Sequence, residues 1–363
     1  MKRNINIFLV SILIAFASCS FTSKSFDDPD KDKLLMQLIT YLLEEGHFEP
    51  KDINDTFSEG VYTSFLNQVD PFKNYFYQSD IDEFEQFKTE IDDQILDHDV
   101  HFFNVVYERL LIRIENSREV YKQVLGTPFD YDLEETFNTE YESKPYATSK
   151  SEMKDNWRKQ LKFSTLSNYH DLVTDDEETK KSNTELEVEA RASTLKSLNE
   201  SASYMDDLRR DDWLSMYINA IAEEFDPHTF YFAPQDKDRF DAQMSGKYEG
   251  IGARLQKKMD IITITEVISG GSAWRQNKLE VGDAILEVRQ EEEIEAVNVV
   301  GMRLDDAVKL IKGPKGTNVI LTLKKVDGTI EDLSIPRDEI ELEETYAKTS
   351  TVKKEGATFG IIN

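Results

Sequence analysis

The sequence of 363 residues contains one cysteine, Cys19, so no disulfide can form within the chain. Positive charge is also scarce, because 43 Lys and Arg stand against 71 Asp and Glu, which gives a net charge of -28 at pH 7. A chain of this charge repels the phosphates of DNA and RNA, and this excludes nucleic acid as a partner. The sequence also lacks an H-E-x-x-H motif, paired metal-ligating histidines and a nucleotide-binding glycine loop. It therefore predicts no metal and no cofactor.

The apolar segment near the N-terminus is too short to span a bilayer. A basic start, Met1-Lys2-Arg3, precedes an apolar run from Ile5 to Ala17, which is typical of an export signal. The segment from Ala15 to Ser20 resembles the lipobox of bacterial lipoproteins, although Phe16 stands where Leu is more common. This resemblance implies that Cys19 carries lipid, which would tether an exported, periplasmic protein to a membrane. Ordinary cleavage nearby, with an incidental cysteine, is the alternative.

The first half of the chain is predicted to be mostly helical. After a polar linker, apolar residues recur at helical spacing from Leu34 to Leu43, and further helices are expected at 53–69, 80–87, 91–119 and 211–225. Residues 130–203 are highly charged and have few bulky apolar residues, so they form either a long exposed helix or a flexible connector. We favour the solvated helix over an adaptor-binding surface.

One sequence pattern occurs twice in this half. The stretch Asp70-Pro71-Phe72-Lys73-Asn74-Tyr75-Phe76 matches Asp226-Pro227-His228-Thr229-Phe230-Tyr231-Phe232, and Asp80, Asp82 and Phe84 match Asp236, Asp238 and Phe240. Because proline resists continuation of a helix and aromatic side chains bury a large area, each copy predicts a corner after a helix with an aromatic plug in the core. We expect His228 to be a hydrogen-bonded structural residue and not an acid or base.

The β-rich pattern from Gly246 to Leu342 opens with a glycine loop, Gly246-Lys-Tyr-Glu-Gly-Ile-Gly-Ala-Arg-Leu255. Alternate glycines allow backbone amides to converge on an anion such as a carboxylate. A strand at 260–267, a helical turn at 273–276 and a strand at 278–288 follow. Leu304, Ala307, Val308 and Ile311 then predict a short amphipathic helix, and Asp327-Gly328 predicts a hairpin turn between two strands. A loop with free amides and a sheet edge are the parts that hold the C-terminus of an extended peptide.

Three phrases in this region resemble the PDZ domain of the bacterial tail-specific, or carboxyl-terminal processing, protease family. They are Tyr248-Glu-Gly-Ile-Gly-Ala-Arg-Leu255, Leu279-Glu-Val-Gly-Asp-Ala-Ile-Leu286 and Gly301-Met-Arg-Leu-Asp-Asp-Ala-Val-Lys-Leu-Ile-Lys-Gly-Pro-Lys-Gly316. The second Asp-Pro corner and the helices before it also resemble that family's N-terminal domain. Two loop positions depart from the pattern, Ser272 in place of a common Pro and the acidic residues after Gln290 in place of a common Gly.

The resemblance implies a set of site residues and a type of substrate. The carboxylate of the peptide would be held by Gly250, Ile251, Gly252 and Ala253. Leu304 and Val308 would line the pocket for the last side chain, so the expected partners are protein substrates with free apolar C-termini.

The resemblance also implies a serine endopeptidase in which a neutral lysine acts as general base. In the family those two residues lie downstream of the PDZ domain. Residues 357–363 match the opening strand of the family's peptidase core, so we expect a truncated chain that is inactive alone. The S-x-x-K matches at Ser151, Ser193 and Ser350 are expected by chance at this composition.

The sequence thus predicts an α+β multidomain protein. The expected parts are a signal peptide with lipobox (1–19), a linker (20–33), a helical N-terminal domain (34–245), a PDZ-like small β-barrel or sandwich (246–342) and the first strand of a peptidase domain (343–363). The predicted function is delivery of substrate C-termini to an exported tail-specific serine endopeptidase, with a possible adaptor protein as a further partner. A non-catalytic PDZ lipoprotein that acts as an adaptor is the alternative, and a structural envelope protein is the weaker third.

Overall fold

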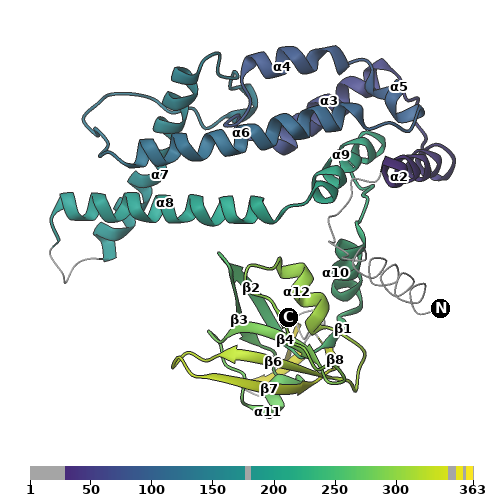
Figure 1. Cartoon of the computed structure of the whole chain (residues 1–363), viewed down its shortest axis with the longest axis vertical. Helices are drawn as coiled ribbons and strands as arrows, with labels where there is room; N and C mark the ends of the chain where they lie inside the picture. Colours follow the sequence, from purple (N-terminus) through teal and green to yellow (C-terminus); the bar gives the residue numbers. More distant parts are fainter. Residues whose placement is uncertain (1–28, 176–180, 342–348, 355–356, 363) are drawn as a thin grey trace, which may run out of the picture.

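The computed structural model describes residues 29–175, 181–341, 349–354 and 357–362. The predicted export signal and Cys19 lie outside these ranges. The described chain is helical up to residue 245 and β-rich after it, which confirms the α+β class (Figure 1). Among the described residues, no helix has both the length and the apolar content that a membrane span requires.

The first half is built from helices, and two of their boundaries differ from the prediction. The first helix begins at Pro29, five residues before Leu34, within the predicted linker. The predicted helix over 91–119 is two helices, because His98 takes a positive φ of 58° between them. The helices are α2 (Pro29–Tyr41), α3 (Asp55–Val69), α4 (Gln78–Phe84), α5 (Ile91–Leu96), α6 (His101–Leu125), α7 (Lys150–Asp175), α8 (Asn183–Asp207), α9 (Arg210–Phe225) and α10 (Pro234–Ser245), with a π-helical turn η1 (Leu42–Gly46) and the 3₁₀ turns η2 (Glu85–Phe87) and η3 (Tyr141–Ser143).

The charged region 130–203 contains two long helices, α7 and α8, which pack against each other and against α6 (Figure 1). The prediction of a helix is confirmed there, but the prediction of full exposure is wrong. Trp157 and Leu161 of α7 are buried against Tyr121 of α6. A few large apolar residues, widely spaced, are sufficient to bury one side of each helix.

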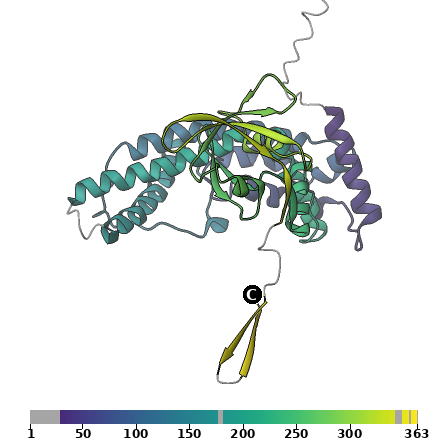
Figure 2. The same cartoon turned by 90° about the horizontal axis from the view of Figure 1, so that it is seen from below.

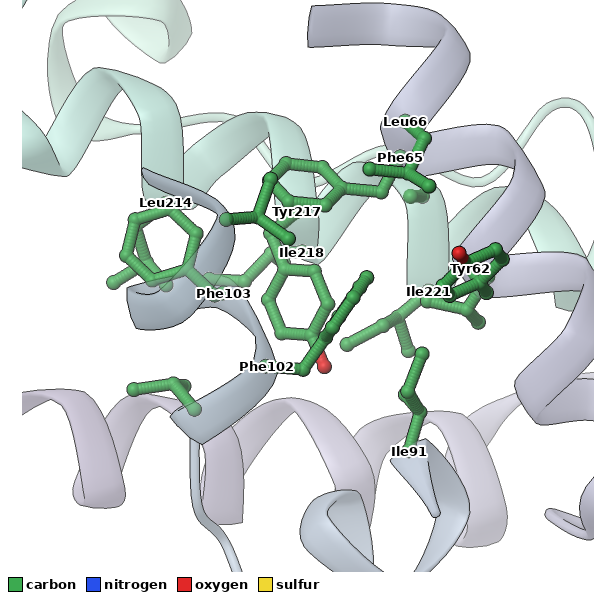
Figure 3. Close-up of a cluster of buried hydrophobic side chains, with 14 of the residues drawn as sticks. Tyr62, Phe65, Leu66, Ile91, Phe102, Phe103, Leu214, Tyr217, Ile218 and Ile221 are labelled. Atoms are coloured by element: carbon green, nitrogen blue, oxygen red, sulfur yellow. The ribbon is translucent and has the colours of Figure 1, made fainter. Parts of the chain in front are cut away.

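The main core of the helical domain is aromatic. The ring centroids of Phe65 and Tyr217 lie 5.2 Å apart in an edge-to-face arrangement, and Phe103 stacks on Tyr217 at 5.8 Å (Figure 3). These three side chains come from α3, α6 and α9. The core therefore joins helices that are far apart in the sequence.

The first Asp-Pro corner is buried as predicted. The carboxylate of Asp70 accepts hydrogen bonds from the amides of Asn74, Tyr75 and Phe76 at 2.8, 3.1 and 2.9 Å. The ring of Phe76 is fully buried and meets Phe84 edge-on at 5.4 Å. Burial raises the pKa of Asp70 to about 6, although the three amides act in the opposite direction.

The second corner differs, and the prediction of an aromatic plug holds there only for Tyr231, which is partly buried and packs against the helical core. Phe230 and Phe232 are 50% and 42% exposed, and Phe232 stacks on Phe240 of α10 at 5.0 Å. The chain passes from this corner directly into α10, so Phe230 and Phe232, unlike Tyr231, remain largely exposed. His228 is exposed, and its Nδ1 lies 2.9 Å from a carboxylate oxygen of Asp226, in agreement with the predicted hydrogen-bonded role.

The β-rich unit contains a six-stranded sheet in the order β2-β3-β4-β6-β7, with β5 paired to β4, and a two-stranded sheet of β1 and β8. All of these pairings are antiparallel. Its core is aliphatic, with Ile262, Ile285 and Leu321 fully buried. Gly328 has φ 89° in the predicted hairpin turn, where an L side chain would be strained. The strands and helices are β1 (Lys247–Gly250), β2 (Ala253–Lys258), β3 (Ile261–Val267), α11 (Ser272–Gln276), β4 (Ala284–Gln290), β5 (Val297–Asn298), α12 (Leu304–Ile311), β6 (Asn318–Lys324), β7 (Ile330–Pro336) and β8 (Asp338–Glu341).

The last described strands form a separate antiparallel hairpin (Figure 2). They are β9 (Thr349–Lys354) and β10 (Ala357–Ile362). The predicted strand after residue 357 is therefore present.

Candidate functional site: a pocket between strand β2 and helix α12

The predicted carboxylate loop joins β1 to β2. The carbonyl of Ile251 accepts a hydrogen bond from the Ala273 amide, and that of Gly252 accepts one from the Ile268 amide, both at 2.9 Å. In the described part of the chain, no backbone carbonyl outside the regular elements accepts from the amides of Ile251 or Gly252. Backbone amides without a protein acceptor are uncommon within a fold, and two in succession suit an anion.

Gly252 is required for the shape of this loop. Its φ is 79°, and a Cβ atom there would lie 3.0 Å from the Cα of Gly271 and 3.2 Å from Cδ1 of Ile340. Both the backbone conformation and the close approach exclude a side chain. The backbone of the loop is therefore packed directly against the backbone of the turn at Gly271.

A cavity of about 110 Å³ adjoins the loop. We call it the terminal pocket. Of the residues predicted for this site, Val308 and three of the four loop residues line it, whereas Gly252 and Leu304 do not. Leu304 packs against the core of the β-rich unit. The lining residues are Tyr248, Gly250, Ile251, Ala253, Leu255, Val308, Ile311 and Lys312.

Sequence reasoning missed four of these residues. Leu255 follows Ala253 by two positions on β2, so strand alternation places both on one face. Ile311 follows Val308 by three positions and shares its helix face. Neither strand alternation nor helical periodicity predicts that Tyr248 and Lys312 line the pocket. Burial raises the pKa of Tyr248 to about 12, so its phenol is neutral around the pocket.

Strand β2 is the edge strand of the sheet, since among the described strands it pairs only with β3. Its other edge is available for an added strand, and α12 packs near the same strand. An extended peptide paired to β2 would place its end at the loop and its last side chain in the terminal pocket. A cavity of about 150 Å³ is known to admit benzene, so this smaller one suits a small aliphatic side chain.

Both walls of the terminal pocket also contact the helical domain through ion pairs. Lys257 of β2 lies 2.6 Å from the Asp207 carboxylate, and Arg303, which precedes α12, lies 2.8 Å from that of Asp212. Arg209 pairs with Asp306 in the first turn of α12. All three helical-domain partners lie within 207–212, where α8 passes into α9. We call this segment the α8–α9 connection.

The described residues show no metal centre. They contain no group of three or more His, Cys, Asp or Glu placed to hold a metal ion. In the first S-x-x-K match, the Lys154 ammonium contacts the side-chain oxygen of Gln123 at 3.4 Å and not Ser151. The side chains of the third match, at Ser350 and Lys353, lie outside the description.

The fold and the pocket define a protein with a helical N-terminal domain followed by a PDZ domain. The sequence of residues 240–324 matches the PDZ domain family. The sequence of residues 39–235, more than half of the chain, matches the family of the tail specific protease N-terminal domain. The chain belongs to the tail-specific protease family.

Two relatives show the extent of the similarity. A tail-specific protease of Haemophilus influenzae is 28% identical over 336 residues, which cover 92% of this chain and 46% of that protein. The carboxy-terminal processing protease CtpA of Bacillus subtilis is 35% identical over 123 residues, which cover 34% of this chain and 25% of that protein. The chain thus spans less than half the length of either relative.

Two solved structures were also matched. The PDZ domain of a carboxy-terminal protease from Vibrio cholerae, in complex with peptide, is 45% identical, and the match covers 26% of this chain and 99% of that one, with a TM-score of 0.25. The photosystem II D1 C-terminal processing protease is 17% identical, with coverage of 53% and 46% and a TM-score of 0.27.

Proposed function

We propose that the terminal pocket and the edge of β2 bind the free C-terminus of a protein substrate with a small apolar last residue. The observation that carries this proposal is that the amides of Ile251 and Gly252, beside a small apolar cavity, donate to no backbone carbonyl outside the regular elements in the part of the chain that the structure describes. Charge-assisted hydrogen bonds to a carboxylate are worth about 1.5 to 3 kcal/mol each before desolvation is subtracted. The carboxylate would therefore fix the end of the peptide, and the cavity would select its side chain.

The membership in the tail-specific protease family supports a role in proteolysis. We infer that the pocket captures substrates for a serine-lysine endopeptidase site that the described residues do not contain. The purified chain is then expected to bind peptides and to cleave none. Release of fragments from an unfolded protein by the purified chain would contradict this.

The predicted lipobox supports an exported protein that is anchored at Cys19. Metabolic labelling with a fatty acid tests this, since the wild-type chain should incorporate the label and Cys19→Ser should not. Equal labelling of both would remove Cys19 as the attachment site.

Binding of the C-terminus is tested with a peptide that carries an N-terminal fluorophore and ends in Ala-Ala, compared with the same peptide as its C-terminal amide. Fluorescence anisotropy should show that the free acid binds at least about tenfold more tightly, because the amide loses the charge. Equal affinities would reject the proposal.

A cavity-filling variant tests the pocket itself. Val308→Phe should abolish binding of the Ala-Ala peptide, because the added ring occupies the terminal pocket. Val326→Phe is the matched control, since Val326 is 68% exposed in the β6–β7 turn. If both variants bind like the wild type, the peptide does not use this pocket.

The alternative is a non-catalytic adaptor. It predicts the same peptide binding. The full gene product distinguishes the two proposals, because an adaptor would lack a peptidase-like serine and lysine throughout and would not cleave a bound substrate.

A further inference from the structure

One cation lies at the terminal pocket. Lys312 follows α12 directly and lines the cavity together with Gly250 and Ile251. Its ammonium lies 5.5 Å from the ring centroid of Tyr248. A Cβ atom placed on Gly250 would be 3.8 Å from Cγ of Lys312. The lysine side chain therefore runs beside the loop that carries the unused amides.

This lysine has no acidic partner within the described residues. Its neighbours differ in this respect: Lys309 lies 3.6 Å from a carboxylate oxygen of Asp306, and Lys315 lies 3.0 Å from one of Asp338. An unpaired ammonium is notable in a chain with a net charge of -28, where acids outnumber bases by 71 to 43. The face of the Tyr248 ring stabilises the ammonium through a cation-π contact that leaves the charge unneutralised.

The negative charge of the protein makes the position of the Lys312 ammonium important for binding a carboxylate. A strongly negative molecule repels the carboxylate at the end of a peptide. Backbone amides supply only partial positive charge, whereas a nearby ammonium supplies a full one, and burial strengthens the attraction. The site therefore contains the one kind of group that offsets the repulsion at the point where the carboxylate would bind.

We propose that Lys312 is a specificity residue, whose ammonium pairs with the C-terminal carboxylate of the substrate while the amides of Ile251 and Gly252 donate to it. Tyr248 is a positioning residue, because its ring holds the ammonium beside the loop. This inference rests on the proposed peptide-binding function and names the group that distinguishes a free acid from a blocked C-terminus.

The test compares Lys312→Met with the wild-type chain for the Ala-Ala peptide as free acid and as amide. Methionine keeps an apolar stem of similar reach and removes the charge. We expect the affinity for the free acid to fall about three- to tenfold, as for a partly exposed ion pair, and the affinity for the amide to stay unchanged. Lys312→Arg should restore the preference for the free acid. The loss should shrink at high ionic strength, because salt screens the pair.

Lys324→Met is the matched control, since it removes the same charge from the exposed end of β6. An unchanged affinity of Lys312→Met for the free acid would overturn the inference while leaving the peptide function intact. An equal loss for acid and amide would assign Lys312 a packing role and also overturn it. If the wild-type chain itself does not prefer the acid, the proposed function is wrong, and the inference falls with it.

Discussion

The two Asp-Pro corners have similar sequences and different surroundings. At the first, Asp70 and Phe76 are buried, whereas at the second Asp226 is half-buried and Phe232 is 42% exposed. The first corner is covered by later parts of the chain, since the indole nitrogen of Trp157 donates to its backbone at 3.1 Å. The second leads out of the helical domain into α10. The shared pattern thus specifies where a helix ends, and the packing partners decide what is buried.

The contrast continues after the corners. Asp80 is fully buried and pairs with Arg109 and Arg113, whereas its counterpart Asp236 pairs with Arg239 at the surface. Phe84 is likewise fully buried, and its counterpart Phe240 is 40% exposed. The same residue types therefore stabilise the fold in one copy and cover a surface in the other.

The largest difference is expected between the two phenylalanines. Phe76→Ala should lower the free energy of unfolding of the helical domain by about 3 to 5 kcal/mol, because it leaves a cavity in the core. Phe232→Ala, the matched change in the second corner, should cost less than about 1 kcal/mol. Chemical denaturation followed by circular dichroism measures both. Similar losses would show that the second corner is also part of the core.

The next difference concerns the aspartates. Asp70→Ala removes the acceptor of three amides, two of them buried, and should cost about 2 to 4 kcal/mol, since each unpaired buried donor is expensive. Asp226→Ala removes an acceptor whose partners reach solvent and should cost much less than Asp70→Ala. The same denaturation measurement applies. A loss at Asp226 as large as that at Asp70 would contradict the comparison.

The pH dependence of the two aspartates should have opposite signs. Burial raises the pKa of Asp70 to about 6, so its contribution to stability is greatest below its ordinary pKa and decreases as the pH rises toward 6. Hydrogen bonds from His228 lower the pKa of Asp226, so its contribution is present above the ordinary value and is lost as the pH falls below it. The measurement is the unfolding free energy of the wild type and of the variants Asp70→Asn and Asp226→Asn as a function of pH. The difference between wild type and each variant should show the corresponding trend. Parallel curves would refute the assigned environments.

The smallest effect is expected at the ion pairs between the domains. There, the contribution of Asp207 to stability should be smaller than that of either corner aspartate. A double-mutant cycle of Lys257→Met and Asp207→Asn should give a coupling energy of about 1 kcal/mol or less. It should decrease further in about 0.5 M salt, where charges are screened within a few ångströms. A coupling that salt does not change would show that dissolved ions do not screen this partly buried pair.

Much of the fold followed from residue patterns. The stripe of Leu304, Ala307 and Ile311 predicted α12 with its observed bounds, and the Asp327-Gly328 turn was predicted from local chemistry. Burial was predicted less well, because it depends on partners that are distant in the sequence, as with Trp157 and Phe232. At the site, strand and helix periodicity identify apolar lining residues. They do not identify Lys312, whose significance comes from its place beside Gly250 and from its lack of an ion pair within the described ranges.

The α8–α9 connection has a mechanical consequence. Within a few residues, its acidic side chains form ion pairs with Lys257 of β2 and with Arg303, which precedes α12. A change in the angle between α8 and α9 would therefore act on the strand and on the helix through the same short segment. Because these links are charged side chains, they can release and form again without disturbing either interior.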